Sequence, residues 1–181
     1  MTAAFDHAVF IRNVMVGRKG LTQAVLSEAF EGAGARRSRS VIATGNIVVE
    51  LSNLEPDAYL ERVRARLLEA TGLSEPLFLR SAEHVHSLVA SDPFENAPRD
   101  DIYEQAVTFT LEPISDALEL PIRSKRGDLE VFAATEREVF AVTRLVGGRP
   151  GNVNALLEKR LEMPCTIRNW NTLERVLTFF G

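Results

Sequence analysis

The sequence predicts an α+β protein made of two tandem ferredoxin-like lobes, each with the split βαβ order βαββαβ and an additional C-terminal helix. Three observations lead to this prediction. Hydrophobic residues make up 45% and charged residues 25% of the chain, values typical of globular proteins. Segments with the strand period of two alternate with segments that have the helical period of 3.6. The order strand, helix, strand, strand, helix, strand, helix occurs twice, and its first six elements are those of the split βαβ motif.

The first half contains clear turn and cap signals. Gly32 and Gly34 end the first helix, because glycine readily adopts the left-handed conformation that closes a helix. Residues 44–46 (Thr-Gly-Asn) form a hairpin turn, Pro56 begins the second helix and Ser81 caps the third. The expected elements are strand 7–16, helix 21–32, strands 38–43 and 47–51, helix 56–70, strand 76–80 and a helix from 81 to about 90.

The second half repeats this pattern after a polar, proline-bearing segment, residues 91–104. Its expected elements are strand 105–111, helix 114–120, a hairpin of strands 129–134 and 139–145, helix 152–161, strand 166–168 and helix 172–180. We therefore expect an N-terminal lobe over 1–95, a linker over 96–104 and a C-terminal lobe over 105–181. A chain of 181 residues can bury roughly 70% of its unfolded surface, so it should fold without a disulfide or metal.

Nothing in the sequence indicates export or a membrane. No apolar run approaches the roughly 20 residues that span a bilayer, and residues 1–7 lack the features of a secretory signal. The single cysteine, Cys165, is expected to be a buried thiol. His84 and His86 stand two apart on a predicted helix and point to different faces, which argues against a metal site. We expect a cytoplasmic protein without metal or cofactor, with a monomer favoured over an oligomer.

Charge is segregated along the chain, although the net charge is only −4. Residues 1–50 carry six basic and four acidic side chains, and residues 144–181 carry six and three. Residues 51–143 carry nine basic and eighteen acidic side chains. If the two basic ends meet in the fold, they form a basic patch on an acidic protein. The alternative is a set of scattered, solvated charges.

Five segments carry a resemblance to a known family. They read I-R-N-V-M-V-G at 11–17, A-T-G-N-I-V-V-E at 43–50, S-D-P-F at 91–94, N-A-L-L-E-K-R-L at 154–161 and P-C-T-I-R-N-W-N-T-L at 164–173. Together they resemble the bacterial family catalogued as domain of unknown function 1697, over nearly the whole chain. The block 168–172 is the most specific match. This family carries no established activity, so the resemblance implies a fold more than a function.

By this resemblance the chain is a divergent member. The family's first motif reads R-G-I-N-V-G-G, and Asn13, Met15 and Arg18 replace its second, fourth and last residues. Its Q-S-G-N corresponds to residues 43–46, Ala-Thr-Gly-Asn, and the Ser-Lys expected before the penultimate helix is Gly-Asn at 151–152. A family function that depends on the first motif is therefore not expected to carry over unchanged.

Three segments have the residue types of anion sites. Residues 147–152, Gly-Gly-Arg-Pro-Gly-Asn, lie between a predicted strand and helix, where backbone amides, a helix N-terminus and Arg149 can hold a phosphate or carboxylate. The alternative is a connection whose glycines adopt unusual backbone angles. Residues 17–20, Gly-Arg-Lys-Gly, form a similar basic loop. Arg168 is either part of a structural ion pair or an anion contact, whereas Trp170 and the asparagines beside it are explained by packing and helix capping.

Other constellations are weaker. Residues 9–14 look like the first-strand motif of an RNA-recognition domain, but residues 46–50 lack the aromatic side chains on which bases stack. The acidic residues between 92 and 101 are expected to be a solvated linker rather than a Mg²⁺ site. No catalytic residue can be assigned.

The best functional hypothesis is a protein that binds an anionic ligand, a nucleotide or nucleic acid, at a basic cleft between the lobes. One alternative is an enzyme acting on a phosphorylated or carboxylated small molecule, and the other is a protein-interaction module. The candidate anion-binding residues are Arg12, Arg18, Lys19, Gly148, Arg149, Asn152, Lys159 and Arg168.

Overall fold

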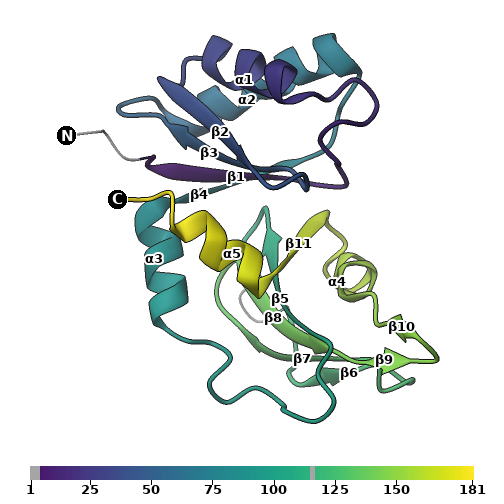
Figure 1. The fold of residues 1–181 in the computed structure, drawn as a ribbon. Coiled ribbons are helices and arrows are strands. Elements are labelled where there is room, and N and C mark those ends of the chain that lie inside the picture. The colour runs from purple at the N-terminus through teal and green to yellow at the C-terminus, as the bar shows by residue number, and fades with distance from the viewer. Residues whose placement is uncertain (1–4, 115–116) are drawn as a thin grey trace. The chain divides into compact units, whose positions relative to one another are not determined.

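The computed structural model describes residues 5–114 and 117–181, and it has the predicted α+β architecture (Figure 1). The chain divides into two compact units. The first contains the chain up to Ser87 together with Glu174–Gly181, and the second contains Leu88–Leu173. Both sheets of long strands are antiparallel. The predicted α+β class is confirmed, whereas the finer ferredoxin-like assignment of both halves stays a prediction.

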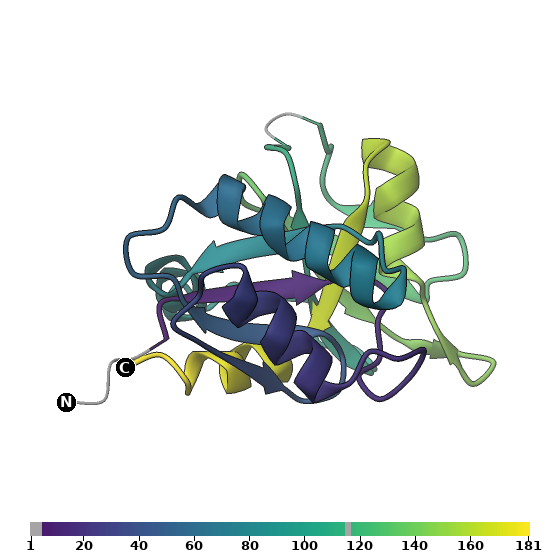
Figure 2. The same ribbon diagram turned by 90° about the horizontal axis from the view of Figure 1, so that it is seen from above.

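The first unit is a four-stranded sheet with two helices on one face. Its elements are β1 (His7–Ile11), α1 (Gln23–Gly32), β2 (Arg37–Val41), β3 (Asn46–Glu50), α2 (Pro56–Thr71) and β4 (Leu77–Ser81), and the strand order is β2-β3-β1-β4. Figure 2 shows α1 and α2 lying across the strands. Alternate strand residues such as Val9, Ile47 and Leu77 pack under Phe30 and Tyr59 of these helices in a continuous core.

Local signals explain where the two helices begin and end. The Thr22 side chain accepts a hydrogen bond from the Val25 amide at the start of α1. Glu55 is the N-cap of α2, with Pro56 in the first turn, and Gly72 ends α2 in the left-handed conformation at φ 72°. The last turn of α1 has no basic residue of its own. Arg62 of α2 supplies a positive charge there instead, because its Nε donates a hydrogen bond to the carbonyl of Ala33, the C-cap of α1, at 2.8 Å.

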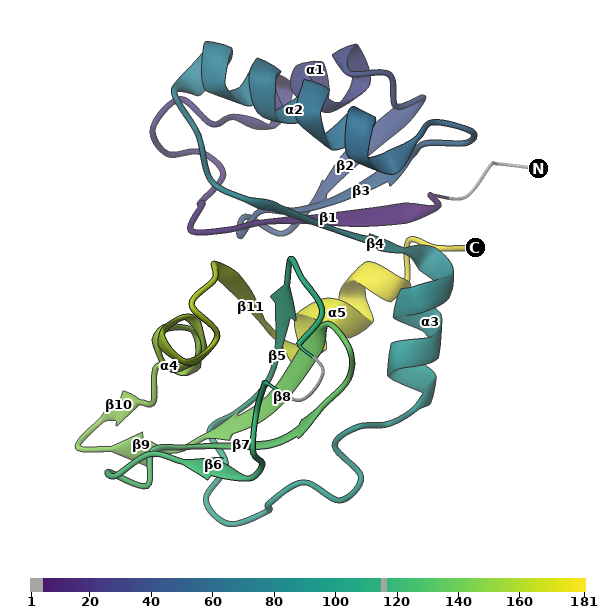
Figure 3. The same cartoon turned by 180° about the vertical axis from the view of Figure 1, so that it is seen from behind.

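The second unit contains a five-stranded sheet. After α3 (Ala82–Ala90) come β5 (Glu104–Thr110), β6 (Ile122–Arg123), β7 (Leu129–Ala134), β8 (Glu138–Thr143), β9 (Leu145–Val146), β10 (Arg149–Pro150), α4 (Val153–Leu161), β11 (Cys165–Asn169) and α5 (Trp170–Leu177). The order is β11-β5-β8-β7-β6, and β9 pairs separately with β10. Figure 3 shows α4 beside β11. The long strands of this half, in chain order, are β5, β7, β8 and β11, and they correspond to β1, β2, β3 and β4 of the first half. With this correspondence the second sheet, read from β7 to β11, has the same strand order as the first sheet.

The two halves differ between β5 and β7. The helix expected over 114–120 includes residues 115 and 116, which lie outside the described residues, and residues 117–120 form no helix. The expectation was therefore wrong for 117–120. Pro113 and Pro121 flank this segment, and seven residues between two prolines leave too little chain for a stable helix. The short strand β6 stands in this connection instead.

The two ends of the described chain meet within the first unit. Phe5 forms a bridge with Phe180, and its ring lies 6.5 Å from that of Phe179. The guanidinium groups of Arg37 and Arg39 lie over the Phe5 and Phe179 rings, at 4.8 and 4.9 Å from the ring centres. Residues after α5 are thus held against β2. No helix in the described ranges combines the length and apolarity needed to cross a membrane.

Asp6 joins the start of the first unit to the turn after β3. Its carboxylate accepts hydrogen bonds from the Leu51 amide at 2.9 Å and the Ser52 amide at 2.8 Å, and lies 2.8 Å from Nδ1 of His7. Partial burial raises the pKa of Asp6, but these hydrogen bonds outweigh it and hold the pKa below its ordinary value of 3.8. The carboxylate is therefore more stable in the folded protein than in the unfolded chain.

We expect Asp6→Asn to lower the free energy of unfolding by about 1–2 kcal/mol at pH 7, because an amide replaces a charged acceptor of two amides. Since the folded pKa is depressed, the contribution is present above about pH 4 and is lost as the pH falls through the folded pKa. Urea unfolding of both proteins between pH 2.5 and 7 measures this. Asp101→Asn, an exposed acid in the second unit, is the control. A difference between wild type and Asp6→Asn that does not shrink in acid would contradict the prediction.

Candidate functional site

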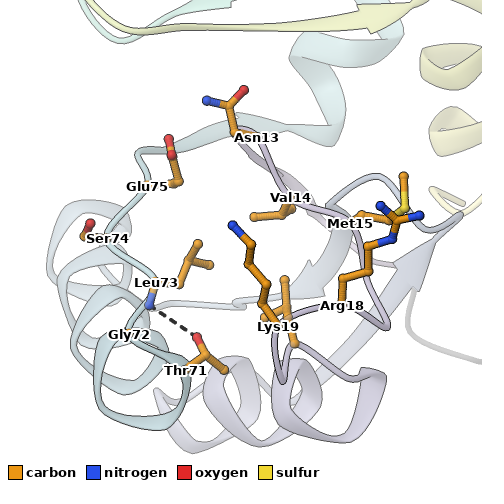
Figure 4. Close-up of a pocket in the computed structure, with 11 residues that line it drawn as sticks. Asn13, Val14, Met15, Arg18, Lys19, Thr71, Gly72, Leu73, Ser74 and Glu75 are labelled. Carbon is orange, nitrogen blue, oxygen red and sulfur yellow. Dashed lines mark hydrogen bonds between the residues drawn. The ribbon is translucent and has the colours of Figure 1, made fainter.

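A pocket of about 500 Å³ opens at one end of the first unit. Two segments line it (Figure 4). One is the loop between β1 and α1, through residues 13–15, 18, 19 and 21, and the other is the end of α2 and the loop that follows it, residues 71–75. Figure 4 shows Ser74 and Glu75 on one side, Arg18 and Met15 on the opposite side, and Lys19 extending into the space between them. The volume is in the range of small-molecule sites.

The backbone of the β1–α1 loop is tightly turned. Asn13 and Lys19 have left-handed φ angles of 54° and 52°, which are uncommon for residues other than glycine. The Gly17 amide donates a hydrogen bond to the Leu21 carbonyl at 2.7 Å, and the Leu21 amide donates one to the Arg18 carbonyl at 3.0 Å. These bonds close a small turn with Arg18 and Lys19 at its tip, where both side chains are exposed.

The β2–β3 turn holds this loop in place through backbone hydrogen bonds. The Ile11 amide donates to the Gly45 carbonyl and the Val16 amide donates to the Ala43 carbonyl, both at 2.8 Å. Gly45 is buried, has a φ of 74° and lies against Val14. The segment 43–46, which the sequence resemblance singled out, therefore positions the pocket loop rather than lining the pocket.

The opposite wall is the end of α2. The Gly72 amide donates to the Leu68 carbonyl at 2.8 Å, and Thr71 Oγ1 donates to the Leu67 carbonyl while accepting from the Leu73 amide (Figure 4). The hydroxyl and the glycine satisfy the last turn of the helix, so the chain leaves it in one defined direction. Leu73 then faces the pocket and Ser74 and Glu75 form its rim.

The pocket carries more positive than negative charge. The side chains of Arg18 and Lys19 make no hydrogen bond or ion pair with any other residue that the structure describes. Glu75 is the acid of the pocket wall, and its Oε2 accepts a hydrogen bond from Arg12 Nη1 at 2.7 Å. The side chains of this pair are 22% and 28% exposed. Because Arg12 compensates Glu75, Arg18 and Lys19 leave a net positive charge.

The glycine-rich segment before α4 has a structural explanation. It forms the β9–β10 hairpin, and Gly147 and Gly148 occupy its two-residue turn with φ angles of 61° and 74°. Arg149 is exposed on β10. The Asn152 side chain accepts a hydrogen bond from the Ala155 amide at 3.0 Å and so caps α4. These contacts favour a connection whose glycines adopt unusual backbone angles over an anion-binding loop. Anion binding in this segment stays a prediction.

Lys159 and Arg168 also belong to the second unit. Lys159 is exposed in the last turn of α4, where a cation stabilises the helix C-terminus. Arg168 is 8% exposed, and its Nη1 donates to Thr166 Oγ1 at 2.8 Å and to the Ile167 carbonyl at 2.6 Å. Burial lowers the pKa of Arg168 to about 10, which leaves the group protonated at neutral pH.

The first unit contains a counterpart of Arg168. Arg80 of β4 is equally buried, at 8% exposure, and its Nη1 donates to the carbonyl of the preceding residue, Leu79, at 2.8 Å. Both arginines occupy the fourth position of the last strand of their sheet, one residue before a side chain that caps the next helix, Ser81 or Asn169. A feature repeated in both halves favours a structural role for Arg168, and the anion contact stays a prediction.

The structure thus brings two of the predicted site residues, Arg18 and Lys19, to one pocket and places Arg12 beside its wall. Glu75 was missed by the sequence reasoning, because it stands 63 residues from its partner Arg12 and no local motif marks it. Elsewhere, Cys165 is buried with Sγ 3.6 Å from the Met163 carbonyl. The described ranges contain no group of three His, Cys, Asp or Glu side chains placed to hold a metal ion.

Comparison with known proteins gives a family but no activity. The model of a family described as protein of unknown function (DUF1697) matches residues 5–140. No curated protein matches the chain. Among solved structures, the conserved bacterial protein SP0830 from Streptococcus pneumoniae is similar with a TM-score of 0.65 and 18% identity. The similarity covers 99% of this chain and 100% of that one, and at this identity it supports the fold alone.

The pocket coincides with the segment in which the chain departs from the family's first motif. Asn13, Met15 and Arg18, the replacements that the sequence resemblance singled out, all line the pocket. Relative to the motif's Gly, Asn and Gly, they add an amide, an apolar side chain that is 45% exposed, and a positive charge.

Proposed function

The chain belongs to the family described as protein of unknown function (DUF1697), and we propose that it binds a small anionic molecule, with nucleotides the first class to test, in the pocket between the β1–α1 and α2–β4 loops. The observation that supports this proposal most strongly is the pair Arg18 and Lys19. Two cations stand at the tip of a closed turn without an acidic partner among the described residues. A phosphate or carboxylate would supply that partner.

The residue types that line the pocket favour a small molecule over a polymer. Apolar side chains such as Val14, Met15 and Leu73 line the pocket together with the charged groups, which is the usual composition of a small-molecule site. Single-stranded nucleic acid binding generally uses aromatic side chains for stacking. The pocket lining contains none.

We expect Lys19→Met to weaken the binding of a nucleoside monophosphate about tenfold or more, since a hydrogen bond to a charged group contributes roughly 1.5–3 kcal/mol. Methionine keeps the length of the side chain and removes its charge. Lys125→Met is the matched control, because it removes the same charge from an exposed position in the second unit. Isothermal titration calorimetry at low and physiological salt measures the effect, and equal affinities of the two variants would contradict it.

An enzyme acting on a phosphorylated or carboxylated small molecule is the second candidate. Glu75 favours it, because this is a carboxylate on the wall of a cationic pocket and could act as a general base. Turnover of phosphate esters by the wild type that Glu75→Gln abolishes would support this reading. Binding without turnover would support the binding protein.

A monomeric, cytoplasmic protein is part of the same proposal. Native mass spectrometry of gently purified protein reports the oligomeric state and any retained ligand in one measurement. A bound mass that matches a nucleotide would support the proposal and name the class. A mass that matches an oligonucleotide would favour a polymer instead.

A further inference from the structure

We propose that the pocket selects zwitterionic small molecules, which carry an anionic group and an amino group. This inference rests on the proposed function, because the anionic group is the one that Arg18 and Lys19 hold. Its new element is Glu75 as the residue that receives the amino group and thereby determines specificity. Three features of the pocket support this role: the orientation of Glu75, its remaining hydrogen-bonding capacity, and the distribution of charge.

The orientation of the Glu75 side chain is fixed by its hydrogen bond with Arg12. Arg12 follows β1 and Glu75 precedes β4, and these two strands are hydrogen-bonded neighbours in the sheet. The 2.7 Å contact between Arg12 Nη1 and Glu75 Oε2 ties the carboxylate to the sheet. A side chain held in this way loses little conformational entropy when a ligand binds it.

One oxygen of this carboxylate remains available. Among the contacts of the described residues, Oε2 of Glu75 accepts from Arg12 and Oε1 accepts no hydrogen bond. Glu75 lines the pocket together with Asn13 and Ser74, whose side chains likewise have no hydrogen-bond partner in the described chain. This side of the pocket therefore offers acceptors to a donor, and an ammonium group presents three.

The charges of the pocket are separated. Figure 4 shows Arg18 on the side opposite Glu75, with Lys19 extending between the two sides. A ligand whose only charge is negative gains from Arg18 and Lys19 but leaves the second oxygen of Glu75, Oε1, without a hydrogen-bond donor. A zwitterion places its anionic group beside Arg18 and Lys19 and its amino group beside Glu75. A polyphosphate instead brings a second negative charge towards the carboxylate of Glu75.

The test compares probe pairs that differ only in the amino group, by calorimetry on the full-length protein. In the phosphate arm, 2-aminoethyl and 3-aminopropyl phosphate are compared with ethyl and propyl phosphate. In the carboxylate arm, 3-aminopropanoate and 4-aminobutanoate are compared with propanoate and butanoate. The arm with the higher affinity identifies the anion. We expect the amino member of the best pair to bind about tenfold tighter, in line with one added charge-assisted hydrogen bond.

Two variants assign this preference to its residue. In Glu75→Gln we expect the preference for the amino member to fall to within about threefold, while pyrophosphate binds more tightly than to the wild type. Glu75→Asp keeps the charge and shortens the side chain, so we expect part of the preference to remain. It serves as the test if the glutamine variant does not fold. Lys19→Met should weaken both members of a pair by the same factor.

The outcomes separate the inference from the function on which it rests. Equal affinities within every pair would overturn the inference and leave the proposed anion binding intact. A preference that persists unchanged in Glu75→Gln would also overturn it, because another group would then receive the amine. If no member of either series binds while a nucleoside monophosphate does, the inference is wrong and the proposed function stands. If the nucleoside monophosphate also fails to bind, both are wrong.

Discussion

Gly45→Ala is expected to lower the free energy of unfolding by about 2–5 kcal/mol. Gly45 has a φ of 74°, and an L-residue in this region costs about 1–2 kcal/mol. A Cβ atom at this position would overlap Cγ2 of Val14 and approach the Ile11 carbonyl to 3.0 Å. Overpacking of a buried site adds about 1–3 kcal/mol. Chemical denaturation measures the sum.

A second glycine separates the two contributions. Gly127 has a similar φ of 70°, and nothing lies within 4 Å of the position a Cβ would take. Gly127→Ala should therefore show the backbone contribution alone, about 1–2 kcal/mol. Because Gly45 supports the β1–α1 loop, its variant should also weaken ligand binding in the pocket, whereas Gly127→Ala should not. Equal destabilisation by both substitutions would show that the contact with Val14 does not matter.

Phe94→Ala is expected to lower the free energy of unfolding by about 3–5 kcal/mol, the usual range for a buried phenylalanine. Phe94 is 7% exposed, and its ring centre lies 5.5 Å from Phe132, 5.9 Å from Phe140 and 5.1 Å from Trp170. It is the central ring of an aromatic cluster that joins the loop after α3 to β7, β8 and the start of α5. Its removal leaves a cavity and breaks three ring contacts.

The fluorescence of Trp170, the single tryptophan of the chain, reports on this cluster directly. In Phe94→Ala we expect its emission to shift to longer wavelength in the native state, since the indole gains access to water. Tyr103→Ala is the control, because Tyr103 is 54% exposed and its loss should change stability by no more than about 0.5 kcal/mol. An unshifted emission with native-like stability would contradict the role of Phe94.

Element types were predictable wherever the signal is local. Ser81 caps α3 by accepting from the His84 amide at 3.1 Å, and Asn152 caps α4, as their positions before apolar periodic segments predict. Pro56 and Gly72 mark the two ends of α2. In each case the residue acts through its own backbone angles or through an amide three or fewer positions away, so the sequence contains the complete cause.

The sequence was less decisive where one pattern fits two structures. The apolar residues at 114, 118 and 120 fit a helix, but the flanking prolines restrict the chain more strongly than the spacing favours helix. The glycines at 147 and 148 likewise allowed two interpretations, an anion-binding loop or a connection with unusual backbone angles, and the pairing of β9 with β10 shows that they form a hairpin turn, while anion binding there stays a prediction. Strand pairing is a contact between segments, and spacing along one segment does not reveal it.

By itself the sequence determined the α+β class, the family, most helix and strand positions, and the two basic loops. These follow from periodicity, caps and turns, which act over a few residues. Only the tertiary structure decided which of the predicted cations share a pocket and that Glu75 stands beside Arg12. It also showed that segment 43–46 is hydrogen-bonded to the β1–α1 loop. The reason is the register of β1 with its neighbours. Hydrogen bonding of β1 to β3 and β4 brings residues 11, 45 and 77 together, and that register depends on burying one face of the sheet beneath α1 and α2.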